Sequence, residues 1–294
     1  MSEVNNSKEL KFNRKDLLGI KELSREEIEL ICDTADSFKE ILERPIRVVP
    51  YLRGKTACFL FFEPSTRTLN SFSLAAKRLS CDSVSVSASS SSVLKGETLL
   101  DTAKNIEAMK VDFVVVRHSA PGAPHLLAKH LRASVINAGD GCHEHPTQAL
   151  LDIFTIREKF GKLDGLNILF VGDILHSRVA RSNIWGMQKM GAKISVCAPP
   201  TLLPYGIEKF GVKVYYNLKD AVKDKDIIYV LRIQKERQRK GLFPSIREYI
   251  KYFSITSEIL NYAKEDVVIM HPGPVNRGVE LAPEIADGHK SLIL

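Results

Sequence analysis

The chain has 294 residues, enough for a sizeable hydrophobic core and, by length alone, for two domains. Its 44% hydrophobic and 26% charged residues are typical of a soluble globular protein. No apolar run approaches the roughly 20 residues that a membrane-spanning helix needs, so we expect no membrane partner.

The net charge of +7 suits a nucleic acid or small anions as ligands. The basic residues are spread along the chain, apart from the run RIQKERQRK at 232–240, which has no interleaved aromatic residues. We therefore expect no nucleic-acid partner. Five scattered cysteines without a C-x-x-C pair, and a polar N-terminus without the apolar core of a signal peptide, predict a reducing, cytoplasmic location.

Helices and apolar strands are predicted to alternate along the first half. A helix at 24–42 begins with a capping box formed by Ser24 and Glu27. The next predicted elements are a strand at 56–63, a helix after it, a strand at 83–88, a helix at 97–109, a strand at 112–118, a short helix at 125–130, a strand at 134–139 and a helix at 146–160.

The second half repeats this alternation. Its predicted elements are strands at 167–173, 193–199, 212–217, 226–233 and 267–274, with helices through 181–190 and 218–223. Strands this apolar, separated by helices, predict parallel sheets covered on both faces. The expected fold is α/β, with two doubly wound parallel-sheet domains at residues 1–147 and 148–294.

Polar clusters follow the predicted strands, where ligands of open α/β sheets bind. The clusters are STRT at 65–68, RH at 117–118, GDGCHEHPTQ at 139–148, GDILHSR at 172–178, LRIQKER at 231–237 and HPGP at 271–274.

The STRT cluster has two interpretations. Ser and Thr favour helix starts for local reasons, so an N-cap and a solvated turn would explain it. Alternatively, backbone N–H groups and the helix dipole form an anion site, in which the hydroxyls donate and Arg67 supplies a forked cation. We favour the anion site, because Arg117 and His145 also follow strands.

Other clusters are weighed in the same way. The CHEH segment at 142–145 contains metal-ligand residue types, but four neighbours cannot easily point at one ion, and we expect no metal. The serine-rich stretch at 83–98 is typical of a flexible linker, or of a loop that delivers Lys95 to an anion. The run at 232–240 is typical of a solvated helix face, although Arg232 and Gln234 directly follow a buried strand.

No nucleophile stands out in the sequence. It contains no G-x-S-x-G elbow, no phosphate loop of the P-loop or G-x-G-x-x-G type, and no cysteine with an obvious base. Arginines, hydroxyls, a lysine and a histidine indicate binding of two anions without a covalent intermediate.

An ordered set of motifs resembles the aspartate carbamoyltransferase family, within the aspartate/ornithine carbamoyltransferase superfamily. The matching segments are FFEPSTRT (61–68), KGETLLDT (95–102), VRH (116–118), NAGDG with HPTQ (137–148), VGD with SR (171–178), RIQKER (232–237) and HPGPVNRG (271–278). Ornithine enzymes usually carry H-C-L-P and an S-M-G loop. This chain has HPGP and no such loop, which favours aspartate.

The resemblance implies an enzyme without a cofactor that transfers the carbamoyl group of carbamoyl phosphate to L-aspartate, early in pyrimidine biosynthesis. It implies a carbamoyl-phosphate-binding domain at 1–147, an aspartate-binding domain at 148–294, and an active site in the cleft between them. The residues implied at carbamoyl phosphate are Ser65, Thr66, Arg67, Thr68, Ser91, Arg117, His145, Gln148, Gly273 and Pro274. Those implied at aspartate are Lys95, Arg178, Arg232 and Gln234.

Within this set, the catalytic residues are expected to be Arg67, Thr68, Lys95, Arg117 and His145. The resemblance also implies that the loop with Ser91 and Lys95 reaches a neighbouring subunit, which gives a homotrimer with shared sites. A regulatory chain is left open as a further partner. Glu63 resembles an acid that pairs with Arg178 and Arg237 on domain closure, although a static salt bridge would also explain it.

The chain departs from the family at three places. Leu69 and Ser73 replace an Arg and a Glu, so an i,i+4 helix pair is lost and stability or loop anchoring is expected to change. Glu144 replaces a common Gln and is expected to alter the charge state of His145. The sequence ends at KSLIL, where family members continue into a helix, so we expect exposed apolar surface there.

Two alternatives to an aspartate enzyme remain. One is a transcarbamoylase for another amino acid, which the residues at 232–237 and 271–274 disfavour. The other is a non-catalytic relative that only binds anions or acts as a scaffold, which the retained arginines, Lys95 and His145 disfavour. An assay of carbamoyl aspartate formation, with ornithine as the control substrate, separates them.

Overall fold

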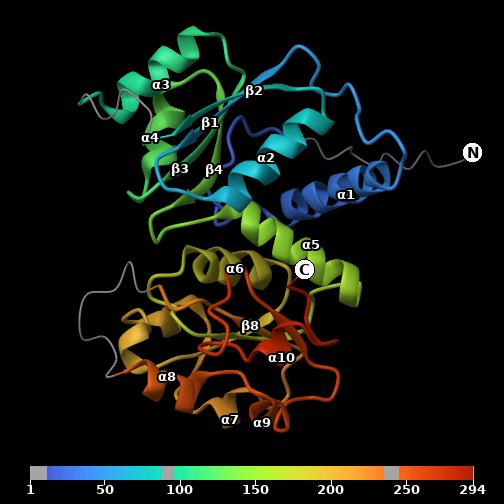
Figure 1. Ribbon diagram of the computed structural model, residues 1–294, viewed down its shortest axis with the longest axis vertical. Helices are drawn as coiled ribbons and strands as arrows, with labels where there is room; N and C mark the ends of the chain where they lie inside the picture. The colour runs from blue at the N-terminus through green and yellow to red at the C-terminus, as the bar shows by residue number, and fades with distance from the viewer. Residues whose placement is uncertain (1–11, 88–95, 235–244, 294) are drawn as a thin grey trace, which may run out of the picture. The chain divides into compact units, whose positions relative to one another are not determined.

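The computed structural model describes residues 12–87, 96–234 and 245–293 (Figure 1). The chain forms two compact units, one of Met1–His118 with Gly122–Ala138 and one of Ser119–Pro121 with Gly139–Leu294. Each unit contains its own parallel β-sheet, which confirms the predicted α/β fold class. No helix in the described ranges combines the length and apolar character needed to cross a membrane.

The first unit follows the predicted alternation closely. Its elements are α1 (Arg25–Leu42), β1 (Thr56–Phe61), α2 (Thr66–Arg78), β2 (Asp82–Ser87), α3 (Leu99–Ala108), β3 (Phe113–His118), α4 (Ala123–His130) and β4 (Ser134–Asp140), whose last residues belong to the second unit. The predicted capping box is confirmed, because the Glu27 amide donates to the Ser24 hydroxyl and the Ser24 amide donates to the Glu27 carboxylate.

Helices cover both faces of the first sheet, as the apolar strands predicted (Figure 1). Side chains of β1 and β3 alternate between the faces, because successive residues of a strand point in opposite directions. One set packs with α3 and α4: Cys58, Leu60, Val114, Val116, Ala103, Ile106, Leu127 and Leu131. The opposite set packs with α2: Ala57, Phe59, Phe61, Val115, Ala76, Leu69 and Phe72.

The sheet of the second unit has five strands, against four in the first unit, and the second unit contains more short helices. Its elements are α5 (Pro146–Phe160), β5 (Asn167–Val171), α6 (Arg178–Lys189), β6 (Lys193–Cys197), the 3-10 helices η3 (Pro200–Leu202) and η4 (Ile207–Phe210), β7 (Lys213–Tyr215), α7 (Leu218–Ala221), β8 (Ile227–Val230), α8 (Ile246–Phe253), α9 (Ser257–Leu260), β9 (Val268–Met270) and α10 (Pro283–Ala286).

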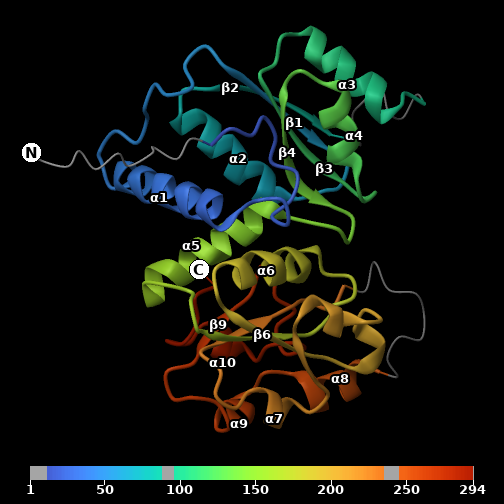
Figure 2. The same ribbon diagram turned by 180° about the vertical axis from the view of Figure 1, so that it is seen from behind.

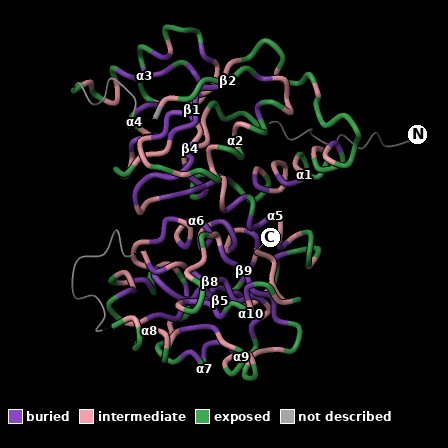
Figure 3. The backbone as a smooth tube through the Cα atoms, in the orientation of Figure 1, coloured by how far each residue is buried: buried purple, intermediate pink, exposed green. Residues whose placement is uncertain are grey.

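Both faces of the second sheet are also covered. Figure 2 shows α7 and α9 on one side of the strands and α5 and α6 on the other. The buried cluster on the first side includes Leu169, Val171, Ile228, Val230, Leu218, Ala221 and Val222. On the other side, Phe170 and Tyr229 have ring centroids 5.0 Å apart. Burial is highest along the inner strands, β1 and β3 in the first sheet and β5 and β8 in the second, as Figure 3 illustrates.

The strand orders place one switch point in each sheet. The first sheet has the order β2-β1-β3-β4 and the second has the order β7-β6-β5-β8-β9. The chain therefore adds strands to one side of β1 and then to the other, and does the same around β5. Ligands of such sheets bind at these points, beyond the carboxyl ends of the strands. The switch points lie between β1 and β3 and between β5 and β8.

Candidate active site

The STRT segment lies directly after β1, at the switch point of the first sheet. Ser65 is the N-cap residue of α2, but its hydroxyl accepts no hydrogen bond from the first helical turn. Instead, Ser65 Oγ donates to Oγ1 of Thr68 at 2.9 Å. Ser65 thus occupies the N-cap position that the capping interpretation expects, but without the side-chain hydrogen bond that such a cap supplies. A helix start whose N–H groups receive no side-chain cap is suited to an anion.

Arg67 is exposed in the first turn of α2. Its guanidinium forms no hydrogen bond or ion pair with the residues that the structure describes in ranges 12–87, 96–234 and 245–293. An exposed fork at a helix start remains available for a phosphate, which an arginine can bind through two oxygens.

Leu69, which replaces a family arginine, packs against the apolar side of the first sheet. It lies partly buried against the cluster that contains Phe59, Phe61 and Ala76. Apolar burial of Leu69 therefore contributes to the stability of the first turns of α2.

Arg117 is at the carboxyl half of β3, on the other side of the same switch point. Its Nη1 donates to the carbonyl oxygen of Ala138 at 3.1 Å, and its Nη2 lies 3.4 Å from Oε1 of Glu63. Glu63 thus pairs within the first unit. Arg117 was not among the partners expected on domain closure, which were Arg178 and Arg237, and Arg237 lies outside the described residues.

His145 is the N-cap residue of α5 and is buried. Its backbone N–H donates to Oγ of Ser182 at 2.9 Å, and its Nδ1 lies 3.3 Å from the hydroxyl of Thr147. The roles of donor and acceptor in this contact depend on the tautomer of the ring; in the tautomer with its proton on Nε2, Nδ1 accepts from the hydroxyl and Nε2 can donate to a ligand.

Glu144, the residue directly before His145, is also buried. Its backbone N–H donates to Oδ1 of Asp140, and its carboxylate accepts a hydrogen bond from the hydroxyl of Ser182 at 3.2 Å. Because Ser182 also accepts from the His145 backbone, Glu144 acts on the turn through Ser182.

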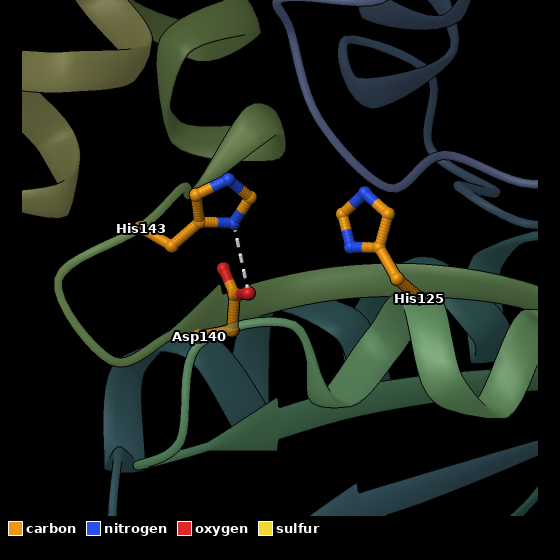
Figure 4. Close-up of side chains that lie close together, drawn as sticks. All are labelled: His125, Asp140 and His143. Carbon is orange, nitrogen blue, oxygen red and sulfur yellow. Dashed lines mark hydrogen bonds and ion pairs between the residues drawn. The ribbon is translucent and has the colours of Figure 1, made fainter.

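The CHEH segment contains one further pair, drawn in Figure 4. Nδ1 of His143 lies 3.0 Å from Oδ2 of Asp140. The hydrogen bond to this carboxylate raises the pKa of His143, against the opposing effect of burial. His125, also drawn in Figure 4, belongs to the first unit, where its Nε2 lies 3.1 Å from Oε1 of Glu22.

Gln148 lies in the first turn of α5. Its Nε2 donates to Oδ1 of Asp152, one helical turn later, at 3.0 Å. Asp152 is buried, and burial raises its pKa to about 6. An ionised carboxylate therefore stands behind Gln148 at neutral pH.

Arg178 is the first residue of α6, which follows β5. Its side chain is buried, and its Nη1 donates to the carbonyl oxygen of Gly141 at 3.3 Å. The preceding residue, Ser177, caps the helix by accepting from the Ala180 amide. This cap fixes the residue at which α6 begins, and therefore the position of the Arg178 backbone from which the side chain extends.

Arg232 and Gln234 follow β8, beside β5 at the second switch point. The backbone N–H of Gln234 donates to Oδ2 of Asp173, at 3.3 Å, and Oδ1 of Asp173 accepts from the His176 ring. The predicted strand at 226–233 ends at Val230; the Leu231 amide still donates to the carbonyl oxygen of Val171 at the end of β5, and Gln234 then bonds to the Asp173 carboxylate.

The HPGP segment follows β9. The Gly273 amide donates to Nδ1 of His271 at 2.8 Å. Two residues after this segment, the Asn276 amide donates to Oε1 of Glu280, and this oxygen also lies 3.5 Å from Nε2 of His271. Both side chains of this pair are fully buried. The loop with Gly273 and Pro274 is thus held at its two ends.

Two predicted site residues, Ser91 and Lys95, lie outside the described residues. Three buried acids that now appear as supports were assigned no role from the sequence: Asp152, Asp173 and Glu280. Each interrupts an otherwise apolar or turn-rich stretch, which is the signal that could have drawn attention to them.

Arginines, hydroxyls, amides and a buried histidine thus stand at the ends of parallel strands in both units. Fold and side chains together define an α/β enzyme of two doubly wound sheets that acts on anionic substrates. The chain belongs to the aspartate/ornithine carbamoyltransferase family. Residues 15–158 match its carbamoyl-P binding domain and residues 164–294 match its Asp/Orn binding domain.

Similar proteins support this membership and the predicted resemblance. The aspartate carbamoyltransferase catalytic subunit of Moorella thermoacetica is 58% identical, over 97% of this chain and 92% of that protein. The aspartate carbamoyltransferase catalytic subunit of Syntrophus aciditrophicus is 57% identical, over 97% of this chain and 93% of that protein. A crystal structure of aspartate transcarbamoylase from Trypanosoma cruzi with carbamoyl phosphate and aspartate has a TM-score of 0.84 at 29% identity, over 95% and 90%. Ornithine carbamoyltransferase from Pyrococcus furiosus has a TM-score of 0.83 at 31% identity, also over 95% and 90%.

Proposed function

We propose that the chain transfers the carbamoyl group of carbamoyl phosphate to the amine of L-aspartate, giving N-carbamoyl-L-aspartate and phosphate. The observation that carries this assignment is the identity of 58% over 97% of the chain with a protein named for that activity. The similar ornithine enzyme is 31% identical. The reaction is an early step of pyrimidine biosynthesis.

The carbamoyl-phosphate-binding part is assigned to residues 1–147 and the aspartate-binding part to residues 148–294. We assign the phosphate to the start of α2, where Ser65, Thr66, Arg67 and Thr68 supply N–H groups, hydroxyls and a cation. The uncapped first turn and the exposed Arg67 support this assignment. Ser91 is assigned to the same substrate from the resemblance alone.

The carbamoyl end is assigned to Arg117, His145 and Gln148, with the main chain of Gly273 and Pro274. A guanidinium and an imidazole N–H can both donate to the carbonyl oxygen as its negative charge develops. Burial supports such a role for His145, because a hydrogen bond in a dry site is stronger than one in water.

The two carboxylates of aspartate are assigned to Arg178, Arg232 and Gln234, with Lys95. The first three follow β5 and β8, which flank the switch point of the second sheet. Arginine forks match carboxylates through two parallel hydrogen bonds, which orient the amine as well as binding the acid.

The chemistry then requires alignment and charge stabilisation. Aligning amine and carbonyl contributes roughly 7–11 kcal/mol by the effective-molarity argument. The amine attacks the carbonyl carbon, the carbon–oxygen bond to phosphate breaks, and the departing phosphate accepts the amine proton. The catalytic residues Arg67, Thr68, Lys95, Arg117 and His145 act as donors and cations, and no side chain forms a covalent bond.

One assay tests the activity. Purified protein is supplied with carbamoyl phosphate and either L-aspartate or L-ornithine, and the carbamoylated products are measured. Formation of carbamoyl aspartate without citrulline supports the proposal. Citrulline alone would assign the chain to the other branch of its family, and no product with either amine would indicate a non-catalytic relative.

The enzyme is expected to work without a metal. Exhaustive chelation should leave carbamoyl aspartate formation unchanged, because the proposed donors are arginines, hydroxyls and a histidine. The rate is measured before chelation, after it, and after zinc is returned. Activity lost to the chelator and restored by zinc would reverse this interpretation.

We infer a homotrimer whose sites are shared, with Lys95 of one subunit serving a neighbour. The name "catalytic subunit" of the similar proteins also supports a regulatory chain as a partner. The cysteines of the described chain are all free, which supports a cytoplasmic location.

Mixing two inactive variants tests the shared site. Arg67→Ala and Lys95→Ala are each expected to be nearly inactive, and their reassembled hybrids should recover part of the wild-type rate. Some sites in the hybrids receive an intact Arg67 from one chain and an intact Lys95 from its neighbour, whereas others receive both defects. Hybrids no more active than either parent, despite proven subunit exchange, would show that each site is built within one chain.

A further inference from the structure

A buried carboxylate in the second unit contacts one of the proposed substrate-binding side chains from behind. Asp152 lies in α5 and accepts three hydrogen bonds. Gln148 Nε2 donates to its Oδ1 at 3.0 Å, and Asn183 Nδ2 and the Tyr229 hydroxyl donate to its Oδ2, both at 2.7 Å. The donors come from α5, α6 and β8, so one side chain joins three elements.

The charge of this carboxylate determines how its neighbours are oriented. Burial raises the pKa of Asp152 to about 6, so the group is ionised at neutral pH. An ionised carboxylate only accepts hydrogen bonds, so each neighbour must turn a donor toward it. Asn183 shows the strength of this demand, because its amide nitrogen faces Asp152 while its Oδ1 stays buried without a partner among the described residues.

The ionised Asp152 also fixes the orientation of the Gln148 amide. Nε2 of Gln148 donates to Asp152, so Oε1 lies on the opposite side of the amide. Within the described part of the chain, Oε1 accepts no hydrogen bond, and the residue is only half-buried in the first turn of α5. Gln148 therefore presents an acceptor, and not a donor, to a ligand.

We propose that Asp152 is a positioning residue that turns the Gln148 amide so that its oxygen recognises the NH2 group of carbamoyl phosphate. This inference rests on the proposed function, in which Gln148 contacts the carbamoyl end. An acceptor in this position distinguishes carbamoyl phosphate from acyl phosphates of the same shape that carry a methyl group instead of NH2. A site built to bond a donor rejects an analogue that lacks it.

The test compares binding of carbamoyl phosphate with binding of acetyl phosphate. In Asp152→Asn, the new carbonyl can still accept from Asn183 and Tyr229, but the new NH2 faces Gln148. The Gln148 amide must then turn round and present its own NH2 to the ligand. We expect carbamoyl phosphate to bind about 10- to 100-fold more weakly, while acetyl phosphate binds nearly as before.

Asp226→Asn is the matched control. Asp226 precedes β8 and accepts from the backbone N–H of Asn167 and from Lys264, away from the strand ends that carry the proposed site. Its replacement should lower thermal stability and leave the ratio of the two dissociation constants unchanged. Asp152→Asn should instead raise thermal stability and change the ratio of the two dissociation constants. Its stability should rise because the pKa of the buried carboxyl is raised, so ionisation at neutral pH costs folding free energy that the neutral amide does not.

Gln148→Leu is the second variant and does not alter the buried network's charge. It should remove the preference for carbamoyl phosphate over acetyl phosphate, whether or not Asp152→Asn folds. An unchanged preference in Gln148→Leu, or in folded Asp152→Asn, would overturn the inference. Wild-type protein that prefers carbamoyl phosphate but forms no carbamoyl aspartate would contradict the proposed function and leave the role of Asp152 supported.

Discussion

Replacing Arg67 with alanine is expected to lower kcat/KM by at least about 100- to 1,000-fold, the cost of removing one oriented donor from a transition state. The fold should survive, because the guanidinium is exposed and bonds to none of the residues that the structure describes. Arg67→Lys should recover only part of the loss, because an ammonium supplies charge without the two-oxygen fork. Steady-state kinetics and thermal unfolding of the same samples measure both effects.

The same helix supplies the control for this variant. Lys77 is an exposed cation in the last turn of α2, whereas Arg67 is in the first. Lys77→Ala removes the same amount of charge and should leave kcat/KM unchanged. A folded Arg67→Ala variant with near-normal turnover would refute the anion site at the start of α2, and with it the assignment of the phosphate.

The second large effect is on stability, at Gly172 between β5 and Asp173. Its φ of +124° is a conformation that side chains rarely adopt, and an added Cβ would lie 2.5 Å from the carbonyl oxygen of Leu231. Strain and overpacking together should destabilise Gly172→Ala by about 3–5 kcal/mol. Thermal unfolding should show a Tm lower by about 10 °C.

Gly165→Ala is a control for Gly172→Ala, because it changes a glycine of positive φ where an added Cβ meets no neighbouring atom. The φ of Gly165 is +81°, but an added Cβ would meet nothing within 4 Å. Gly165→Ala should therefore show only the cost of a left-handed backbone conformation, and a larger loss in Gly172→Ala reports the contact with Leu231 together with the rarer φ of +124°. Equal losses would mean that the close approach is unimportant. Because Arg232 follows Leu231, Gly172→Ala should also raise the KM for aspartate.

Much of the fold could be predicted because buried parallel strands are marked by continuous apolar runs. The segments around Phe59 and Ile228 each carry such a run, and helix patterns separate them from the next strand. The strand-end rule then located the polar clusters without knowledge of the strand order. The short helices α8, α9 and α10 were not predicted, although α4 and α7, which are equally short, were.

The side-chain partners could not be predicted in the same way. Glu144 and Ser182 are 38 residues apart, and Asp152 and Tyr229 are 77 apart. Such contacts depend on how helices pack on a sheet, and no local pattern reports them. The capping box at Ser24 could be predicted because both partners lie within one turn. At Ser65 the N-cap position agrees with the same local rule, but the hydroxyl bonds to the Thr68 side chain and not to a backbone amide of the first turn.

The buried pair of His271 and Glu280 has a consequence for the thermodynamics of ligand capture. Within the loop between them, the Gly273 amide is bonded to His271 and the Asn276 amide to Glu280, and both of these side chains have no exposure to solvent. A flexible loop would lose conformational entropy each time a ligand binds, at a free-energy cost of roughly 1–2 kcal/mol per ordered residue. Here part of that freedom is lost once, when the chain folds, so the main chain at Gly273 and Pro274, which we assign to the carbamoyl end, is ordered before a ligand binds.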